Sequence, residues 1–365
     1  MAVMSSDAPA PAPAFDPARL SMARELAGLR GPELAEAVGL TPAAVSRYEL
    51  GQLRPDPCTL ARCADRLGVR VGFFAPGRPH LRLDTAHAHF RSLCAIGAAE
   101  RAQALAHVEL LWEVANALDE VAELPAVDLG CHHDGPERTA HAIRGACGVE
   151  TGPVQHLVRA LEARGVVVTR LPATAGTNVG AFSCALPDRP VIVLTEREDP
   201  LRQRFSVAHE LGHLLLHPDA APGCRVHESE ADAFAAEFLT PAEEIAGTFP
   251  LNAELDAVKE LADAYGVSVK ALAARARGLG LMTDAAHRRL LTAFAKRGWR
   301  TAEPVGGEYP GEQPNLLCRA MVRAAEHGVD LAALAVRLRV DTATLRGLIG
   351  FTERHEDAPR TLRLV

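Results

Sequence analysis

The stretch from Arg204 to His217, "RFSVAHELGHLLLH", decides how the central part of the chain is interpreted. Two histidines four residues apart lie on nearly the same face of a helix, so the imidazoles of His209 and His213 can reach one metal ion while Glu210 points slightly aside. Metal-assisted hydrolysis needs this geometry. The apolar residues of the same stretch also fit a plain core helix, so the motif alone leaves both interpretations open.

The composition is that of a globular protein long enough for two or three domains. The chain has 365 residues, of which 48% are hydrophobic and 23% charged. No apolar run approaches the roughly 18 to 20 residues needed to cross a bilayer, and residues 1–15 lack the features of a signal peptide. We therefore expect a cytoplasmic protein with no membrane partner and a disordered Pro/Ala-rich tail over residues 1–18.

The cysteines do not indicate a structural site. Eight of them are scattered along the chain without any C-x-x-C pair, which argues against a disulfide framework and a four-cysteine zinc site. The "CHH" from Cys131 to His133 could ligate a metal but has no second cluster at ligand spacing. Buried thiols are the simpler interpretation.

The N-terminal part has helix-start and turn residues at the spacing of a helix-turn-helix. In residues 29–57, "LRGPELAEAVGLTPAAVSRYELGQLRPDP", Pro32 starts a short helix and Gly39 supplies a turn. Thr41 then caps a second helix. If that helix enters the major groove, the candidates for base or phosphate contact are Thr41, Ala43, Ala44, Ser46 and Arg47.

Charge supports the same interpretation. Between Arg19 and Arg78 nine arginines and six acidic residues give a net charge of +3, whereas the remainder of the chain carries −10. The ending "SRYELGQLRP" resembles the "S-x-Y-E-x-G-x-x-x-P" pattern of the Xre/Cro-like helix-turn-helix family. The resemblance implies DNA as a partner, although the same bihelical unit can also serve protein contacts alone.

The pattern "ELAEAVGLTPAAV" recurs twice later in the chain. "ELADAYGVSVKAL" starts at Glu260, and "ALAVRLRVDTATL" starts at Ala333 and has Arg339 in place of the turn glycine. Each predicts a bihelical unit. We expect neither later copy to lie in a basic region, so packing or partner contact is favoured over DNA reading for both.

The centre of the chain predicts a small α+β domain. A proline-free helical pattern joins the N-terminal domain to it. Three short strands then precede the histidine helix, which indicates a small antiparallel or mixed sheet with that helix on one face. The linking helix is expected over 97–123, and the strands over 166–171, 180–186 and 190–194.

A third metal ligand must come from another element, because a catalytic zinc keeps three protein ligands and one open position. The apolar spacing of "HESEADAFAAEFLTP", residues 227–241, predicts a second helix with an acidic start. Glu228 and Asp232 lie four residues apart on one face. Glu230 is rotated about 200° from Glu228 and is better interpreted as a solvated acid.

Together the two helices resemble the ImmA/IrrE family of bacterial metallopeptidases, whose members pair an "H-E-x-x-H" helix with an "E-x-x-A-[ND]-x-F-A" helix. The resemblance runs from about Gly135 to Met282, and an Xre-like domain before such a peptidase fits the family. It implies Zn2+, with Mn2+ as an alternative. The implied residues are the ligands His209, His213 and Glu228, the general base Glu210, and Asp232 as hydrogen-bond acceptor for a ligating histidine.

Two details of the site stay open. The group that stabilises the oxyanion could be His217, Arg225 or His227, each of which also fits a structural or surface role. Cys224 precedes the second helix, where its thiolate could occupy the fourth zinc position and silence the enzyme. A loop cysteine usually has no such role.

We expect a mostly α chain with a small α+β domain. The resemblance implies a DNA-binding regulatory protease of the stress-response type that cleaves a transcriptional repressor or antitoxin-like protein. The alternative is a non-cleaving transcriptional regulator whose peptidase-like domain senses a ligand or metal, and a homodimer stays open. The expected division is a disordered tail (1–18), a helix-turn-helix bundle (19–79), a helical linker (80–130), a zincin-like peptidase domain with a three-stranded sheet (131–282) and a helical C-terminal region (283–365).

Overall fold

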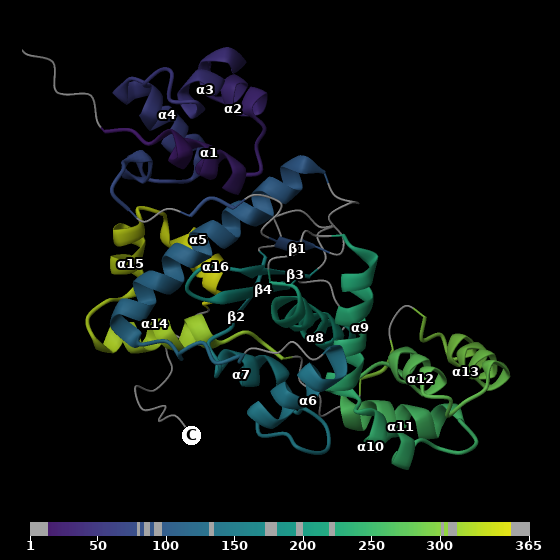
Figure 1. Ribbon diagram of the computed structural model, residues 1–365. Coiled ribbons are helices and arrows are strands. Elements are labelled where there is room, and N and C mark those ends of the chain that lie inside the picture. Colours follow the sequence, from purple (N-terminus) through teal and green to yellow (C-terminus); the bar gives the residue numbers. More distant parts are fainter. Residues whose placement is uncertain are drawn as a thin grey trace, which may run out of the picture.

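Helices surround a single small sheet in the computed structural model of the chain (Figure 1). The predicted class, mostly α with a small α+β domain, is confirmed. Cys131 to His133 and residues 1–13 lie outside the described part. The structure describes residues 14–78, 81–83, 88–90, 97–130, 135–171, 181–194, 200–218, 223–300, 303–305 and 312–351.

The N-terminal domain is a four-helix bundle closed by a short 3-10 turn. Asp16, Thr41 and Asp56 each accept a backbone N–H at a helix start, and a proline follows each of them. The first of these caps starts a helix at Pro17, so the expected tail of residues 1–18 extends too far. The elements are α1 (Pro17–Leu26), α2 (Gly31–Ala37), α3 (Pro42–Glu49), α4 (Pro57–Leu67) and η1 (Val71–Phe74).

The sheet has four strands in the order β1-β3-β4-β2, rather than the three predicted. The extra strand pairs antiparallel with β3 and comes from the segment expected to be a helical linker. β3 and β4 are antiparallel, whereas β2 and β4 are parallel, so the sheet is mixed. The strands are β1 (Ala88–Phe90), β2 (Val167–Arg170), β3 (Phe182–Ala185) and β4 (Pro190–Leu194).

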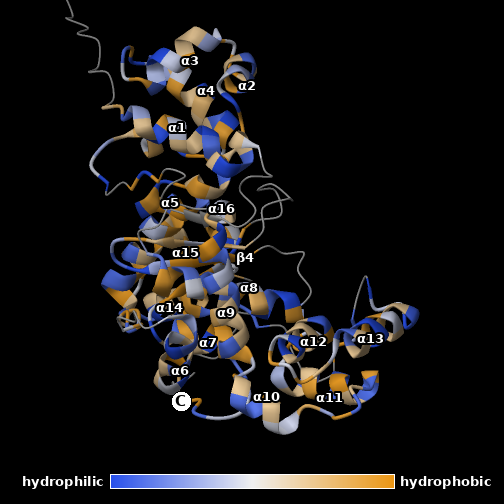
Figure 2. Cartoon of the chain, turned by 45° about the vertical axis from the view of Figure 1, so that its right-hand side comes forward, coloured by the Kyte–Doolittle hydropathy of each residue, from blue (hydrophilic) through white to orange (hydrophobic). Residues whose placement is uncertain are grey.

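The sheet separates two hydrophobic cores, because alternate side chains of a strand point to opposite faces. In β4, Val191 and Val193 join the core with α5 and α14–α16, while Ile192 and Leu194 join the core with α6–α9. Figure 2 shows hydrophobic residues gathered on the helices around the sheet. These helices are α5 (Ala98–Ala122), α6 (Pro136–Ala146), α7 (Leu157–Glu162), α8 (Pro200–Leu216), α9 (Arg225–Leu239), α14 (Leu316–Glu326), α15 (Leu331–Leu338) and α16 (Thr342–Ile349).

Helix α5 confirms the predicted helix between the domains but is not a free linker. Most of it is buried between α1 and α14. Its carboxylates hold the N-terminal domain: Glu113 pairs with the buried Arg19, and Glu109 pairs at 3.1 Å with Arg82, which in turn pairs with Glu25 of α1. The N-terminal bundle is therefore anchored to the rest of the molecule by buried charges.

All three repeats of the bihelical pattern adopt one geometry. Each first helix ends in a left-handed residue, with φ of 67° at Gly39, 64° at Gly266 and 59° at Arg339. Two residues later a side chain caps the next helix, and Ser268 does this in the second copy as Thr41 does in the first. The predicted internal similarity is thus structural.

The remaining helices form an arm on one side of the molecule, away from the N-terminal bundle (Figure 1). In it α13 packs against α11 and α12, whereas α14–α16 pack on α5 and β2. The expected boundary between residues 282 and 283 therefore divides elements that pack together. The arm consists of α10 (Ala242–Thr248), α11 (Leu255–Tyr265), α12 (Val269–Gly278) and α13 (Asp284–Lys296).

Candidate metal centre

The site is built where α8 and α9 approach each other closely. Gly212 makes this approach possible, because a Cβ there would lie 3.0 Å from the Phe234 ring and 3.2 Å from the Cα of Ala231. The glycine inside the "HELGH" motif therefore has a packing reason. Its consequence is that the start of α9 lies beside the histidines of α8.

Three side chains converge at this crossing. The Nε2 atoms of His209 and His213 are 3.1 Å apart, and the Glu228 carboxylate oxygens lie 3.4 Å from the first and 3.5 Å from the second. In the part of the chain that the structure describes, this is the one group of His, Cys, Asp or Glu that could hold a metal. A tetrahedral ion with ligands at 2.0–2.1 Å needs ligand separations of about 3.3 Å. The donor set therefore fits zinc.

Asp232 orients the first histidine. Its Oδ1 lies 2.9 Å from His209 Nδ1, and because a carboxylate only accepts, the imidazole donates there while its Nε2 faces Glu228. Burial alone would lower the pKa of His209, but the carboxylates of Asp232 and Glu228 raise it to about 9. The two imidazoles outweigh burial at Glu228 and hold its pKa far below the usual range. The two carboxylates thus stabilise positive charge on the His209 ring.

Glu210 lies beside this group and is itself buried. The hydroxyl of Ser183, on β3, donates a hydrogen bond of 2.8 Å to Glu210 Oε2. Sequence analysis missed Ser183. The available signal was its place in "GAFSCAL", where it is the polar residue on the strand face that points to the motif helix. β3 therefore positions the carboxylate that the motif supplies.

Comparison with known families identifies the two parts. Residues 161–277 match the model of the IrrE N-terminal-like domain, and residues 18–71 match a helix-turn-helix domain. The chain carries an IrrE N-terminal-like domain behind a helix-turn-helix. No curated protein matches it. The two matches support a DNA-binding regulator with a peptidase-like domain, and none of the described helices is long and apolar enough to span a membrane.

The oxyanion candidates lie at one end of the site in the IrrE N-terminal-like domain. The rings of His217 and His227 stack at 4.3 Å, and His217 lies 5.7 Å from the ring of His213. Arg225 is exposed at the first residue of α9. Among the described residues, the structure brings the two histidines, but not Arg225, toward the centre.

Two rejected alternatives have clear positions. Glu230 Oε2 lies 3.4 Å from His217 Nε2 and is not among the three converging ligands. Cys224 is exposed at the N-cap of α9 and also lies outside that group. Neither completes the ligand set in the described structure.

The candidate DNA-reading helix of the helix-turn-helix domain is α3. Thr41 uses its hydroxyl to cap this helix by accepting the Ala44 N–H at 3.2 Å. Ala44 is half-buried and packs against the core. Ala43, Ser46 and Arg47 are exposed on the same helix.

Proposed function

We propose that the chain is a DNA-binding regulatory metallopeptidase with His209, His213 and Glu228 as ligands of Zn2+ or Mn2+. The observation that carries the proposal is the convergence of these three side chains beside a buried Glu210 that a hydroxyl holds in place. A binding-only zinc site needs the ligands but not an oriented carboxylate next to them. For the domain division, we propose a helix-turn-helix domain that includes α1, and a peptidase-like domain whose arm extends through α13.

The residues divide the work of peptide hydrolysis. A bound zinc ion supplies a Lewis acid that polarises the substrate carbonyl and makes water more acidic. Glu210 accepts a proton from the attacking water while the water oxygen forms a bond to the carbonyl carbon. The C–N bond then breaks, and Glu210 returns the proton to the departing amine. Asp232 fixes the tautomer of His209, and His217 or His227 donates to the developing oxyanion.

The regulated target follows from the two domains. A helix-turn-helix domain binds DNA. We therefore propose that the chain cleaves a repressor or antitoxin-like protein that is bound near the DNA sites of this domain. Ala43, Ser46 and Arg47 contact the DNA through the exposed face of α3. The non-cleaving sensor remains the competing function, and it predicts no role for Glu210.

Metal content tests the ligand set. Full-length protein purified without chelator is expected to hold one Zn2+ or Mn2+ per chain by elemental analysis. Glu228→Ala and His213→Ala should lose it, whereas Glu210→Gln should keep it. A matched control is Glu230→Ala, which alters a neighbouring acid outside the ligand group and should retain the metal. Retention by all four variants contradicts the site.

Cleavage is tested without knowing the substrate. Protein termini are compared by mass spectrometry in cells that express wild type or Glu210→Gln at equal levels. New termini should appear with wild type and fall by at least about 100-fold with the variant, which is the lower end of general-base catalysis. If no termini differ while ligand variants alone disturb transcription, the sensor function replaces the protease.

A further inference from the structure

The arm concentrates positive charge that the site does not use. Residues 270–300 contain eight lysines and arginines and one acid, a net charge of +7, whereas the whole chain carries −7. The expectation that the second bihelical unit lies outside a basic region fits α11 but not α12, which this segment includes. The rest of the chain therefore carries −14, and this segment stands out against it.

Part of this charge is neutralised and part is not. Arg275, Arg277 and Arg297 have salt-bridge partners in Glu237, Asp284 and Asp256. Within the described residues, no carboxylate partner is recorded for the exposed Lys270, Arg288, Arg289, Lys296 and Arg300.

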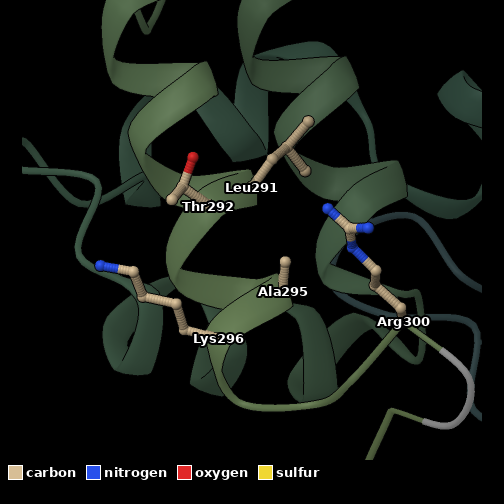
Figure 3. A pocket seen from close by; sticks show the side chains of 5 residues that line it. All are labelled: Leu291, Thr292, Ala295, Lys296 and Arg300. Atoms are coloured by element: carbon tan, nitrogen blue, oxygen red, sulfur yellow. The ribbon is translucent and has the colours of Figure 1, made fainter.

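Four of these cations lie on α13 and the turn that follows it, and Lys270 lies on the adjoining α12. Arg288, Thr292 and Lys296 are spaced by four residues on α13, so they form a stripe that rises about 12 Å along the helix. Lys296 and Arg300 flank a shallow cavity of about 420 Å³ that Thr292 also lines (Figure 3). An adjoining cavity of about 570 Å³ adds Lys270 from α12. Lys296 and Lys270 therefore lie at two different cavities, which share Leu291 and Arg300 as lining residues.

We propose that this face, formed by Lys270, Arg288, Thr292, Lys296 and Arg300, binds the phosphate backbone of duplex DNA as a second contact apart from the helix-turn-helix. Lysine, arginine and threonine side chains are the groups that contact phosphates without reading sequence. The proposal does not depend on peptidase activity.

The face lacks the features of two other partners. A protein interface centres on exposed aromatic or aliphatic anchors, and among the described residues no large exposed hydrophobic side chain lies between 270 and 300. Binding of single strands relies on aromatic platforms, but Phe294 is 2% exposed and Trp299 carries Arg297 over its ring. The positive charge of this surface therefore favours the phosphates of a duplex as its partner.

Salt-dependent binding to a duplex without an operator tests the face. Fluorescence anisotropy is measured with the full-length chain and a non-specific duplex of 24 base pairs between 50 and 200 mM salt. Each phosphate contact contributes about 0.9 to the slope of log affinity against log salt. Replacing Arg288, Lys296 and Arg300 by Gln should therefore reduce the slope by about 2 to 3 and weaken binding at least tenfold.

The control has the same charge change elsewhere. Arg159, Arg202 and Arg337 are exposed on other helices, and their replacement by Gln should leave the slope unchanged. Arg288→Lys with Arg300→Lys keeps the charges and should keep the binding, and melting by circular dichroism checks that all variants fold. Equal slopes for the two triple variants overturn the proposal. The proposal is also overturned if the variant of Arg288, Lys296 and Arg300 loses binding to poly-L-glutamate but still binds DNA. That result would assign the face to an acidic protein.

Discussion

Ser183 contacts the proposed general base Glu210 but no metal ligand is on its strand. Its substitution therefore tests the orientation of Glu210 separately from metal binding. Ser183→Ala deletes one hydrogen bond to a charged group, worth about 1.5–3 kcal/mol, from a strand that provides no ligand. We expect the turnover number on the identified substrate to fall between about tenfold and a hundredfold. The metal content and KM should stay near wild type.

A neighbour on the same strand provides the matched control. Cys184 is as buried as Ser183 but points into the opposite core, so Cys184→Ala costs packing without touching the base. Restoration of the rate by Ser183→Thr would show that the hydroxyl is responsible. Equal losses in Ser183→Ala and Cys184→Ala would mean that Ser183 has only a structural role.

Single residues with a fixed chemical spacing were the easiest to predict. His209, His213, Glu228 and Asp232 occupy helical positions whose spacing alone determines which face they share, and the structure brings all four together. Ser183 could not be found in this way, because its partner lies 27 residues away and the pairing depends on how β3 crosses α8. The metal-binding roles themselves stay predictions until metal is measured.

Arg339 occupies the left-handed position at the C-terminal end of α15, where glycine is the favoured residue. It ends α15 in the left-handed conformation, where a side chain is strained by about 1–2 kcal/mol. Its guanidinium donates 2.8 Å to the carbonyl of Gly72 in the N-terminal domain. The strained position is thus used to tie α15 to η1.

Two substitutions at Arg339 separate strain from contact. Both Arg339→Ala and Arg339→Gly lose the bond to Gly72, but only alanine keeps the left-handed strain. We expect both to destabilise the chain in urea unfolding, with alanine about 1 kcal/mol less stable than glycine. Equal stabilities would show that this turn relaxes when the side chain is shortened.

Elements were predictable where local signals agreed. Thr41 with Pro42 predicted a helix start that the structure has at α3, whereas the helix start at Pro17 fell in the segment expected to be a tail. β1 was missed because three residues are too short to show a period of two, and its pairing is made by a distant strand. The burial of α5 was missed because it depends on helices from both ends of the chain.

The arrangement of the whole molecule depends on charges buried at the junction between domains. Glu109, 1% exposed, accepts the backbone N–H of Leu83 at 2.7 Å and pairs with Arg82. Arg19 and Arg78 approach Glu113 one turn further along α5. The stability of this junction should therefore depend on pH.

Glu109 makes that dependence testable. Burial raises its pKa from 4.5 to about 7, against the opposing hydrogen bond from Leu83. Between these values the folded state binds more protons than the unfolded chain, so the stabilising contribution is complete below pH 4.5 and is lost as pH rises through about 7. Glu109→Gln mimics the protonated form and keeps an acceptor for Leu83. Its stability advantage over wild type should therefore grow from pH 5 to pH 8 by on the order of 3 kcal/mol.

The measurement can be confined to this junction. The chain has two tryptophans, and Trp112 lies on α5 between the two buried acids, so a Trp299→Phe background makes its fluorescence a local reporter of urea unfolding. Other titrating groups are common to both proteins and cancel in the difference. Asn116→Ala, which removes no ionisable group from the same helix, should give a pH-independent difference. If Glu109→Gln behaves like this control, the buried carboxylate stays ionised across the range and the junction does not respond to pH.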